Sequence, residues 1–416
     1  MLLARAPFRK GKCAYVIESQ AVCGHCSEIK QGGTVFASDT EDNNNRPHGK
    51  GSLFESLSRS ANMLTSDIAT GPDHDQLVAA ACKKAGVATD MVLGFRDVTE
   101  FLEEYLKECC GRTSRLICAG HVSPDVAIAA DRADMKVEEA LGESPFSGDV
   151  RSALALVEKK NDVIYVANPN RITGANFSIR DLRSLAAAVP DGALIIDEHF
   201  FEYFEITGLP MLRDHGNVVI LRSLASPARL GTSDAGFAVA HKTSMARIRE
   251  RVRVNDIPRA TCRALVRGLV DAEAANASVK EAHDESLRLA ISLTRLGIQC
   301  RLSATNFVLL RVASPKDVGN SLVAGGVSVE NLDGYPLLKN YMRYRIGSPR
   351  VNDRLVKAFT QMPSRHFKMS GYDCRAAIQR RRKQVTEELP RLRQGCETEM
   401  YSHAVERQAI YQVADN

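Results

Sequence analysis

The chain has 416 residues, of which 44% are hydrophobic and 25% are charged. A chain of this length buries a sizeable core and is too long for one typical domain, so we expect two packed domains with tails. The net charge of +5, from 55 basic and 50 acidic side chains, is too small to indicate nucleic-acid binding by itself. We therefore expect a small-molecule ligand or a protein partner rather than nucleic acid.

The amino-terminal sequence gives no sign of export or membrane insertion. Residues 1–12 carry four basic side chains, but no apolar run of signal-peptide length follows them. No stretch approaches the roughly eighteen apolar residues that span a membrane. We expect a cytoplasmic protein without a membrane partner, and we expect its eleven scattered cysteines to be reduced and mostly buried.

Residues 1–60 are interpreted as a partly flexible amino-terminal extension. Within it, Cys23, His25 and Cys26 have the spacing of zinc ligands, and Cys13 and His48 are candidates to complete a site. A zinc knuckle needs a second close pair of ligands, which this segment lacks. We therefore predict no metal site here.

Helical and strand patterns alternate from about residue 71 onward, which predicts a mainly parallel sheet covered by helices on both faces. We assign residues 61–270 to this large α/β domain. Its strands are expected at short apolar runs whose lengths are typical of buried strands. These runs are Leu116–Ala119, Val163–Ala167, Ala193–Ile196, Val218–Leu221 and Gly236–Ala240.

Two helices of this domain have recognisable starts. Residues 97–109 place their apolar side chains on one face, and Asp97 with Glu100 resembles a capping box. Ser178 is the predicted N-cap of a second helix. Because the first backbone N–H groups of a helix are unpaired, such starts are able to bind an anion.

The rest of the chain predicts a smaller domain and a tail. Residues 244–296 are helix-rich, residues 298–358 contain strands, and we assign residues 271–364 to a smaller α+β domain. Residues 365–416 predict a basic helical extension with four consecutive basic residues at 380–383. We interpret these as a solvated helix face, because the aromatic residues that would stack on single-stranded nucleic acid are absent there.

Six short motifs follow one another along the chain. They are Asn168–Gly174, Ile195–Phe200, Leu221–Ser226, Gly236–Ala240, Asn306-Phe307 and Arg343–Gly347. Their order and spacing resemble the class I/II aminotransferases of fold type I, and most of all the histidinol-phosphate aminotransferase and threonine-phosphate decarboxylase branch. The resemblance implies a mainly parallel large α/β domain, a smaller carboxy-terminal domain, pyridoxal phosphate as cofactor, and a homodimer.

The resemblance also implies roles for individual residues. Asp197 corresponds to the aspartate that keeps the pyridine nitrogen of the cofactor protonated. The lysine that holds the cofactor as a Schiff base is expected three residues after Ser223. That position is Ser226, and no lysine occurs between Lys160 and Lys242. Serine has no amine, so we predict that the cofactor is not bound covalently.

Further cofactor positions of the family are substituted. The arginine on the cofactor phosphate corresponds to Asp234, whose charge repels a dianion. The asparagine at the ring hydroxyl is Arg171, and the tyrosine after the strand aspartate is Phe200. Ser223 is retained, and at the helix start that cradles the phosphate only Thr99 offers a donor side chain. We infer that the scaffold was kept while the cofactor site changed.

The positions that contact the substrate are partly retained. Arg343 corresponds to the arginine that clamps the substrate α-carboxylate, although a surface arginine beside Arg345 is an equal interpretation. The second arginine of the histidinol-phosphate branch is Glu330, which argues against the usual phosphorylated substrate. The ring-stacking aromatic falls near His121, and the tyrosine that reaches across the dimer is Gly71.

Three functional hypotheses follow. The first is a non-catalytic homologue that cannot transaminate and serves as a binding or regulatory protein, with an amino or organic acid as its candidate ligand. The second is an enzyme with rebuilt acid–base chemistry, in which His199 is the candidate catalytic residue beside Asp197, Glu198, His121 and Arg171. The third is an aminotransferase or decarboxylase that uses pyridoxal phosphate non-covalently.

Overall fold

The computed structural model describes residues 72–110, 115–223, 235–253 and 257–372, and the backbone of two short strands at 3–5 and 15–17. The chain divides into two compact units. The larger unit contains the described residues from 72 to 284 together with 303–306, and the smaller unit contains 285–302 and 307–372 with the two short strands. Helix α10 (Ala272–Arg295) contributes residues to both units. The predicted domain boundaries stay predictions.

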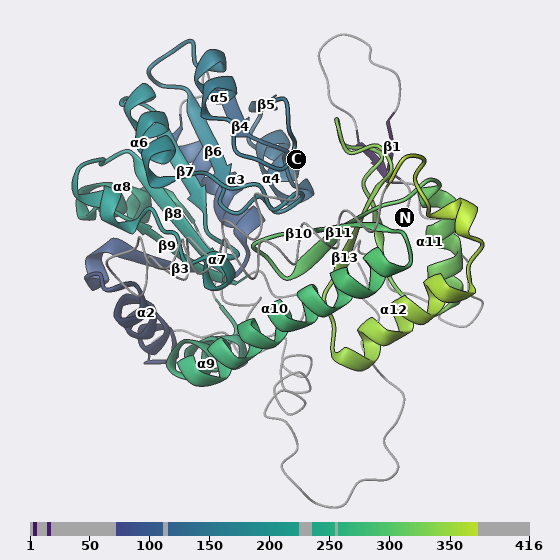
Figure 1. The fold of residues 1–416 in the computed structure, drawn as a ribbon. Coiled ribbons are helices and arrows are strands. Elements are labelled where there is room, and N and C mark those ends of the chain that lie inside the picture. The colour runs from purple at the N-terminus through teal and green to yellow at the C-terminus, as the bar shows by residue number, and fades with distance from the viewer. Residues whose placement is uncertain are drawn as a thin grey trace, which may run out of the picture. The chain divides into compact units, whose positions relative to one another are not determined.

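The larger unit is built on a seven-stranded sheet in the order β3-β9-β8-β7-β6-β4-β5 (Figure 1). Among the described strands of this sheet, β9 alone runs against its neighbours β3 and β8, and the other pairs are parallel. The strands are β3 (Val92–Phe95), β4 (Arg115–Ala119), β5 (Lys136–Ala140), β6 (Val163–Ala167), β7 (Ala193–Asp197), β8 (Val218–Ser223) and β9 (Gly236–Ala240). The predicted fold class and the five predicted strands are confirmed.

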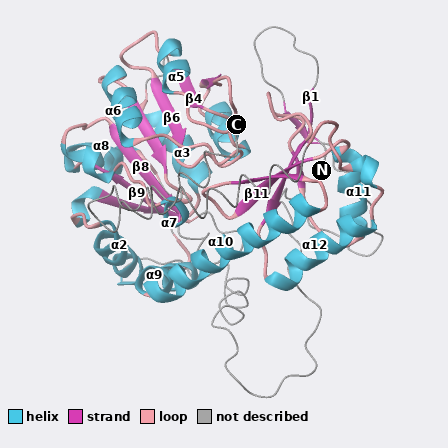
Figure 2. Ribbon diagram, viewed as in Figure 1, coloured by secondary structure: helices cyan, strands magenta, loops and turns pink. Residues whose placement is uncertain are grey.

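Helices pack on both faces of this sheet (Figure 2). One face contacts α2, α5, α6 and α9 through a hydrophobic cluster that includes Leu182 and Leu265. The other face contacts α3, α4 and α8 through a second cluster that includes Phe101 and Met245. None of the described helices has the length and hydropathy that a membrane span requires. The helices of the two faces are α2 (Pro72–Ala85), α3 (Val98–Cys109), α4 (Pro124–Arg132), α5 (Val150–Leu156), α6 (Ile179–Ala188), α8 (Lys242–Arg251) and α9 (Arg259–Val270).

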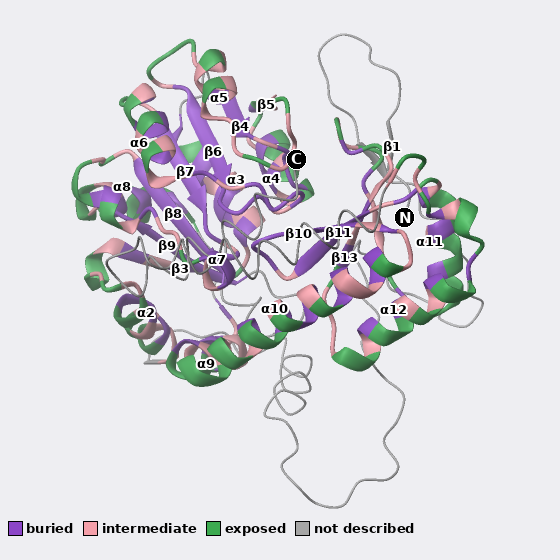
Figure 3. Cartoon of the chain, in the orientation of Figure 1, coloured by how far each residue is buried: buried purple, intermediate pink, exposed green. Residues whose placement is uncertain are grey.

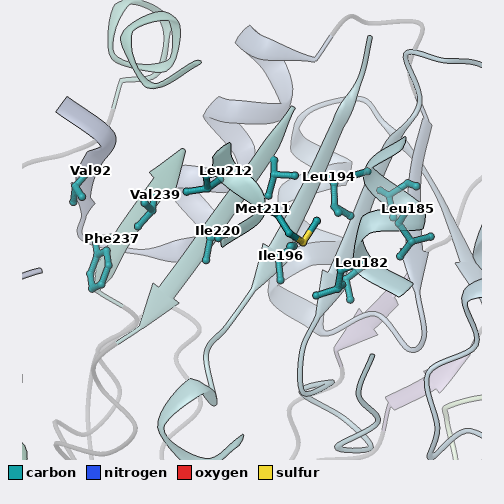
Figure 4. Close-up of a cluster of buried hydrophobic side chains, with 14 of the residues drawn as sticks. Val92, Leu182, Leu185, Leu194, Ile196, Met211, Leu212, Ile220, Phe237 and Val239 are labelled. Atoms are coloured by element: carbon teal, nitrogen blue, oxygen red, sulfur yellow. The ribbon is translucent and has the colours of Figure 1, made fainter. Parts of the chain in front are cut away.

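The central strands are completely buried. Every residue of β6, β7 and β9 is buried, which explains why these strands are unbroken apolar runs in the sequence. Figure 3 shows the contrast between these buried strands and the exposed outer faces of the helices. Figure 4 shows part of one core cluster, where Ile196 and Ile220 of the sheet and Leu182 of α6 share a layer with Met211. Each buried side chain of this size contributes about 1.5–3 kcal/mol.

The predicted starts of two helices are confirmed. Asp97 is the N-cap of α3, and its Oδ1 accepts hydrogen bonds from the N–H groups of Thr99 at 2.8 Å and Glu100 at 3.1 Å. Ser178 and Asp181 form a reciprocal capping box at the start of α6. Local side-chain chemistry therefore fixes where both helices begin.

The smaller unit contains a four-stranded antiparallel sheet in the order β10-β11-β13-β12. Leu322 of α11 and Phe359 of α12 contribute to its buried residues. The short strands β1 (Leu3–Arg5) and β2 (Tyr15–Ile17) pair with each other in antiparallel fashion. The other elements are β10 (Gln299–Leu302), β11 (Phe307–Arg311), α11 (Pro315–Ala324), β12 (Glu330–Asn331), β13 (Tyr341–Arg345) and α12 (Pro349–Gln361).

Candidate functional site

One edge of the large sheet gathers several of the predicted site residues. Strands β3, β4, β6, β7 and β8 run in the same direction, so their carboxyl ends share this edge. His121 follows β4, Arg171 follows β6, and Asp197 and Ser223 end β7 and β8. Ligands of α/β proteins usually bind at the carboxyl ends of parallel strands. The candidate cofactor positions therefore lie where such a site is expected.

The loop after β6 is held in a defined shape. Asn170 donates from Nδ2 to the backbone carbonyl of His121 at 2.9 Å, and its Oδ1 accepts from two N–H groups within the loop. Gly174 has a φ of +75°, and a Cβ at this position would lie 2.5 Å from the Cβ of Ser303. Only glycine fits there without a shift of the backbone. These contacts fix the backbone that carries Arg171.

Asp197 is a buried carboxylate, with 2% of its surface exposed. Its Oδ2 accepts a hydrogen bond from the hydroxyl of Tyr165 at 2.5 Å, and its Oδ1 accepts from the N–H of His199 at 3.0 Å. Burial and then the nearby negative charge of Asp197 raise the pKa of Tyr165 well above its ordinary value, so the phenol stays protonated and donates. The carboxylate is thus satisfied by donors of the chain itself.

Arg171 adds a positive charge at the same carboxylate. Its Nη1 lies 3.7 Å from Oδ2 of Asp197 and 3.3 Å from Oδ2 of Asp125, which lies in the first turn of α4. The Arg171 side chain is 13% exposed, so its pair with Asp197 lies inside the protein. The guanidinium of Arg171 therefore lies beside the carboxylate of Asp197. The resemblance implies that this carboxylate would contact the pyridine nitrogen of the cofactor.

The start of α3 is the place to which the resemblance assigns the cofactor phosphate. The N–H groups of Thr99 and Glu100, which would face a phosphate there, are instead bonded to the side chain of Asp97. A negative charge at a helix amino terminus is stabilised by the helix dipole. The carboxylate of Asp97 thus occupies an anion position at this end of the helix.

Glu198 belongs to a separate buried ion pair rather than to the Asp197 cluster. Nε of Arg222 donates to Oε2 of Glu198 at 2.9 Å, while the N–H of Gly208 and the hydroxyl of Thr207 donate to Oε1 at 2.7 and 2.9 Å. The guanidinium carbon of Arg222 lies 3.7 Å from the centroid of the Phe201 ring. These contacts engage both carboxylate oxygens of Glu198 in holding the β7–β8 region together.

His199 and Phe200 connect β7 to the short helix α7 (Phe201–Phe204). Phe200 is buried and contacts the ring of His199 edge-on, with centroids 4.7 Å apart. It makes a similar contact with Tyr203 at 6.1 Å. The side chain of Phe200 is therefore an apolar packing element, which its lack of a hydroxyl suits, and His199 is half-buried beside it.

Arg343 lies in the smaller unit, on β13, directly opposite Glu330 of β12 in the sheet register. Its Nε donates to Oε2 of Glu330 at 2.7 Å, and its Nη2 contacts the same oxygen. The guanidinium carbon also lies 5.3 Å from the centroid of the Phe307 ring. The guanidinium that the resemblance assigns to a substrate carboxylate is therefore paired with a carboxylate of the chain.

Some predicted positions lie outside the described residues, namely Gly71, Ser226, Asp234, the cysteines of the first sixty residues and the basic residues 380–383. Within the described part of the chain, no group of three or more His, Cys, Asp and Glu side chains is arranged to hold a metal ion. The sequence analysis did not identify Tyr165 as a site residue. A tyrosine inside a fully buried strand needs a partner for its hydroxyl, and that requirement is the signal that could have found it.

Comparison with known proteins places these motifs in a family. The family model for aminotransferase class I and II matches residues 121–359, which is more than half of the chain. The chain belongs to this family. Its match covers the loop after β4, the Asp197 edge of the large sheet and most of the smaller unit, so both units of this aminotransferase-like protein are part of the family scaffold.

Individual relatives support the expected branch. The chain is 26% identical over 296 residues to the histidinol-phosphate aminotransferase of Chlorobaculum tepidum, which covers 68% of this chain and 82% of the relative. Other curated histidinol-phosphate aminotransferases match over shorter stretches, and the chain spans little more than half of their length.

Solved structures confirm fold type I. The histidinol-phosphate aminotransferase from Sinorhizobium meliloti, in complex with pyridoxal-5'-phosphate, has a TM-score of 0.63 at 17% identity and covers 74% of this chain and 86% of its own. L-threonine-O-3-phosphate decarboxylase from Porphyromonas gingivalis has a TM-score of 0.58 at 19% identity and covers 74% and 94%. At these identities the likeness concerns the fold alone.

Proposed function

We propose that this protein is a member of the aminotransferase family that does not transaminate and acts as a binding or regulatory protein on the family scaffold. One observation carries the proposal. Each of three groups that the family uses for ligands is paired with a charged group of the chain itself. Asp97 occupies the start of α3, Arg171 accompanies Asp197, and Glu330 pairs with Arg343.

The described residues do not fit pyridoxal phosphate in the way its family binds it. In that family the cofactor supplies an electron sink that stabilises a carbanion, and it needs an anion cradle and an aspartate free for its ring nitrogen. The Asp97 carboxylate would repel a phosphate at the start of α3. Arg171 beside Asp197 would repel a protonated pyridine nitrogen. We therefore derive no chemical step through the cofactor.

The substrate end of the family site supports the same proposal. A bidentate guanidinium is the usual partner of a substrate carboxylate, but in this chain Glu330 already accepts from Arg343. The sequence adds that Ser226 stands at the lysine position, with no other lysine between Lys160 and Lys242. A Schiff base at this site has no amine to form from. The proposal extends to a cytoplasmic homodimer, on the basis of the family resemblance.

The test is a titration of the full-length protein with pyridoxal phosphate, followed by borohydride reduction, desalting and peptide mass mapping. We expect no absorbance band of a Schiff base and no cofactor fixed at a single lysine. The histidinol-phosphate aminotransferase of Chlorobaculum tepidum, treated in parallel, is the positive control. Reduction that fixes the cofactor at one lysine of the wild-type chain, or measurable transamination, would refute the proposal.

One variant separates the effect of the missing lysine on cofactor binding from the effect of the internal pairing. Ser226→Lys restores the amine but leaves Asp97 and Arg171 in place. We expect this variant still to lose the cofactor on desalting, because the phosphate and ring positions remain unsuited to it. Stable retention of the cofactor by Ser226→Lys alone would mean that the described residues do fit it. Internal pairing would then not be the reason why the wild-type chain fails to hold the cofactor.

A further inference from the structure

A cavity of about 810 Å³ lies in the larger unit, away from the Asp197 edge. It is lined by the first residues of β6, β7 and β8, among them Val163 and Ala193, and by α3 and α8. Because these three strands are parallel, their amino ends lie at the edge opposite Asp197. The four residue-to-residue steps from Ala193 to Asp197 along β7 put the two edges roughly 13 Å apart. The cavity is therefore separate from the site described above.

A buried tyrosine lines this cavity. Tyr105 of α3 is 6% exposed, stacks on Phe101 with ring centroids 5.9 Å apart, and lines the cavity. Its hydroxyl makes no hydrogen bond to any described residue. Burial raises the pKa of Tyr105 well above its ordinary value, so the hydroxyl stays a donor. Because Tyr105 lines the cavity, a ligand or water in the cavity is the available partner of its hydroxyl.

Two arginines of α8 stand one turn apart on the wall of the same cavity. Burial raises the pKa of Tyr105 and of Cys109, and the charge of Arg247 partly offsets the rise for Tyr105, as the charges of Arg251 and then Arg247 do for Cys109. Arg247 makes no hydrogen bond or ion pair within the described residues, and Arg251 makes one bond, to the backbone carbonyl of Glu108 at 3.3 Å. Both guanidinium groups are thus available to an anion.

The remaining polar groups of the cavity are compatible with an anion. The first turn of α8 lines the cavity, where Nδ1 of the N-cap His241 accepts from the N–H of Thr243 at 3.4 Å, and His215 adds a second imidazole. Two acidic residues also line it, Asp191, which is exposed, and Asp214, which is paired with Arg183 at 3.3 Å. The donors thus come from Tyr105 of α3 and from Arg247 and Arg251 of α8. A tetrahedral oxyanion accepts hydrogen bonds from donors in several directions, whereas the oxygens of a carboxylate lie in one plane.

We propose that this cavity binds a small organic phosphate, whose phosphoryl oxygens accept from the hydroxyl of Tyr105 and the guanidinium groups of Arg247 and Arg251. The volume of about 810 Å³ lies within the range of small-molecule sites. The organic part of the ligand packs against the half-buried Cys109 side of the cavity. The proposal does not depend on the absence of transamination, because it uses none of the residues at the Asp197 edge.

Isothermal titration of the full-length protein with inorganic pyrophosphate, at fixed ionic strength, tests the site. We expect saturable binding of one ligand per chain with a Kd below about 1 mM. Arg247→Ala removes a charged donor and is expected to weaken binding about tenfold or more, and Tyr105→Phe, which keeps the ring, about two- to tenfold. Arg267→Ala, an exposed arginine of α9 outside the cavity, is the matched control and is expected to bind as the wild type does.

Two outcomes would overturn the proposal. The first is no saturable binding of pyrophosphate by the wild type at millimolar concentration. The second is binding that Arg247→Ala and Arg267→Ala weaken equally while Tyr105→Phe has no effect, since that pattern reports general surface charge. Circular dichroism of each variant shows whether it is folded, and a variant that loses binding while its spectrum is unchanged supports the site.

Discussion

The buried carboxylate of Asp197 is surrounded by donors and a cation of the chain itself. Removing a carboxylate from water costs several kcal/mol unless donors or cations surround it. Asp197, with 2% of its surface exposed, receives the Tyr165 hydroxyl, the His199 N–H and the charge of Arg171. The charge of the cluster is therefore balanced by residues that the sequence itself supplies.

Arg171→Asn restores the residue type that the family resemblance expects and removes the cation beside Asp197. We expect the free energy of unfolding to fall by about 1–3 kcal/mol, less than for the loss of a shorter buried pair, because the contact is 3.7 Å long and two hydrogen bonds remain. Urea denaturation measures the change. Arg183→Ala, which breaks an exposed pair with Asp214, is the control and should cost less than about 1 kcal/mol.

A double-mutant cycle decides whether this loss belongs to the pair. Asp197→Asn removes the charge that Arg171 compensates, so the double variant should be less destabilised than the sum of the two single variants, by about 1 kcal/mol or more. Strict additivity of the two losses would mean that Arg171 acts through packing or through Asp125 instead.

Glu202 of α7 is a half-buried acid in a different environment. Its Oε2 is buried and has no hydrogen-bond partner within the described residues. Burial raises the pKa of Glu202 to about 7 from an ordinary 4.5, and a backbone hydrogen bond and then the nearby charge of Arg222 only partly offset this. Between these two pH values the folded protein binds more protons than the unfolded chain. Stability therefore falls as the pH rises through this window, by at most about 3 kcal/mol.

Glu202→Gln mimics the protonated acid and should remove this pH dependence. At pH 8 the variant is expected to be more stable than the wild type, whereas at pH 4.5 the two should be alike. Thermal unfolding at both pH values measures the difference, with Glu143→Gln on the exposed surface as the control. Equal stability of Glu202→Gln and wild type at pH 8 would show that the carboxylate is solvated there.

At the scale of elements, α3 depends on its own N-cap where the family uses the helix start for a phosphate. Asp97→Ala frees the N–H groups of Thr99 and Glu100 and is expected to cost about 0.5–2 kcal/mol. Asp97→Asn keeps an acceptor oxygen and should cost less. Urea denaturation of both variants tests this. If the two substitutions cost the same, the charge of Asp97 rather than its capping bonds stabilises the helix.

The sequence predicted those elements whose pattern is local. The central strands are buried on both faces and read as unbroken apolar runs, and Asp97 and Ser178 mark their helices by cap chemistry. Strand β5 was not predicted, because Lys136–Ala140 is an edge strand with charged, partly exposed residues. Strand β3 was missed as well, since it has only four residues.

The sequence predicted where the candidate site residues lie, but not which side chains they contact. The motifs placed Asp197 and Arg171 after their strands, and the shared edge follows from parallel topology. The contact of Asp197 with Tyr165 joins residues thirty-two positions apart, and that of Arg343 with Glu330 follows from the register of two antiparallel strands. Such pairs depend on tertiary packing, and no local pattern in the sequence encodes them.

For the whole molecule, the scaffold of the family is retained while its ligand groups are paired internally. Both parts of this pattern are what the proposed function, a family member that folds without the cofactor, requires. A buried site with unpaired charges would destabilise the chain until a ligand bound, because binding to the folded state adds stability by mass action. Internal pairing removes this dependence on a ligand.

The same reasoning predicts how the oligomeric state responds to the cofactor. The family resemblance implies a homodimer, and we expect light scattering of the full-length protein to give twice the 45.5 kDa of one chain. Asp197 and Arg171 at this edge are already paired within the chain. The mass and the melting temperature should therefore be the same with and without pyridoxal phosphate. The Chlorobaculum tepidum relative, measured in parallel, should gain stability on adding the cofactor. A monomer would contradict the homodimer, and a dimer that forms only with pyridoxal phosphate would show that the cofactor still organises the interface.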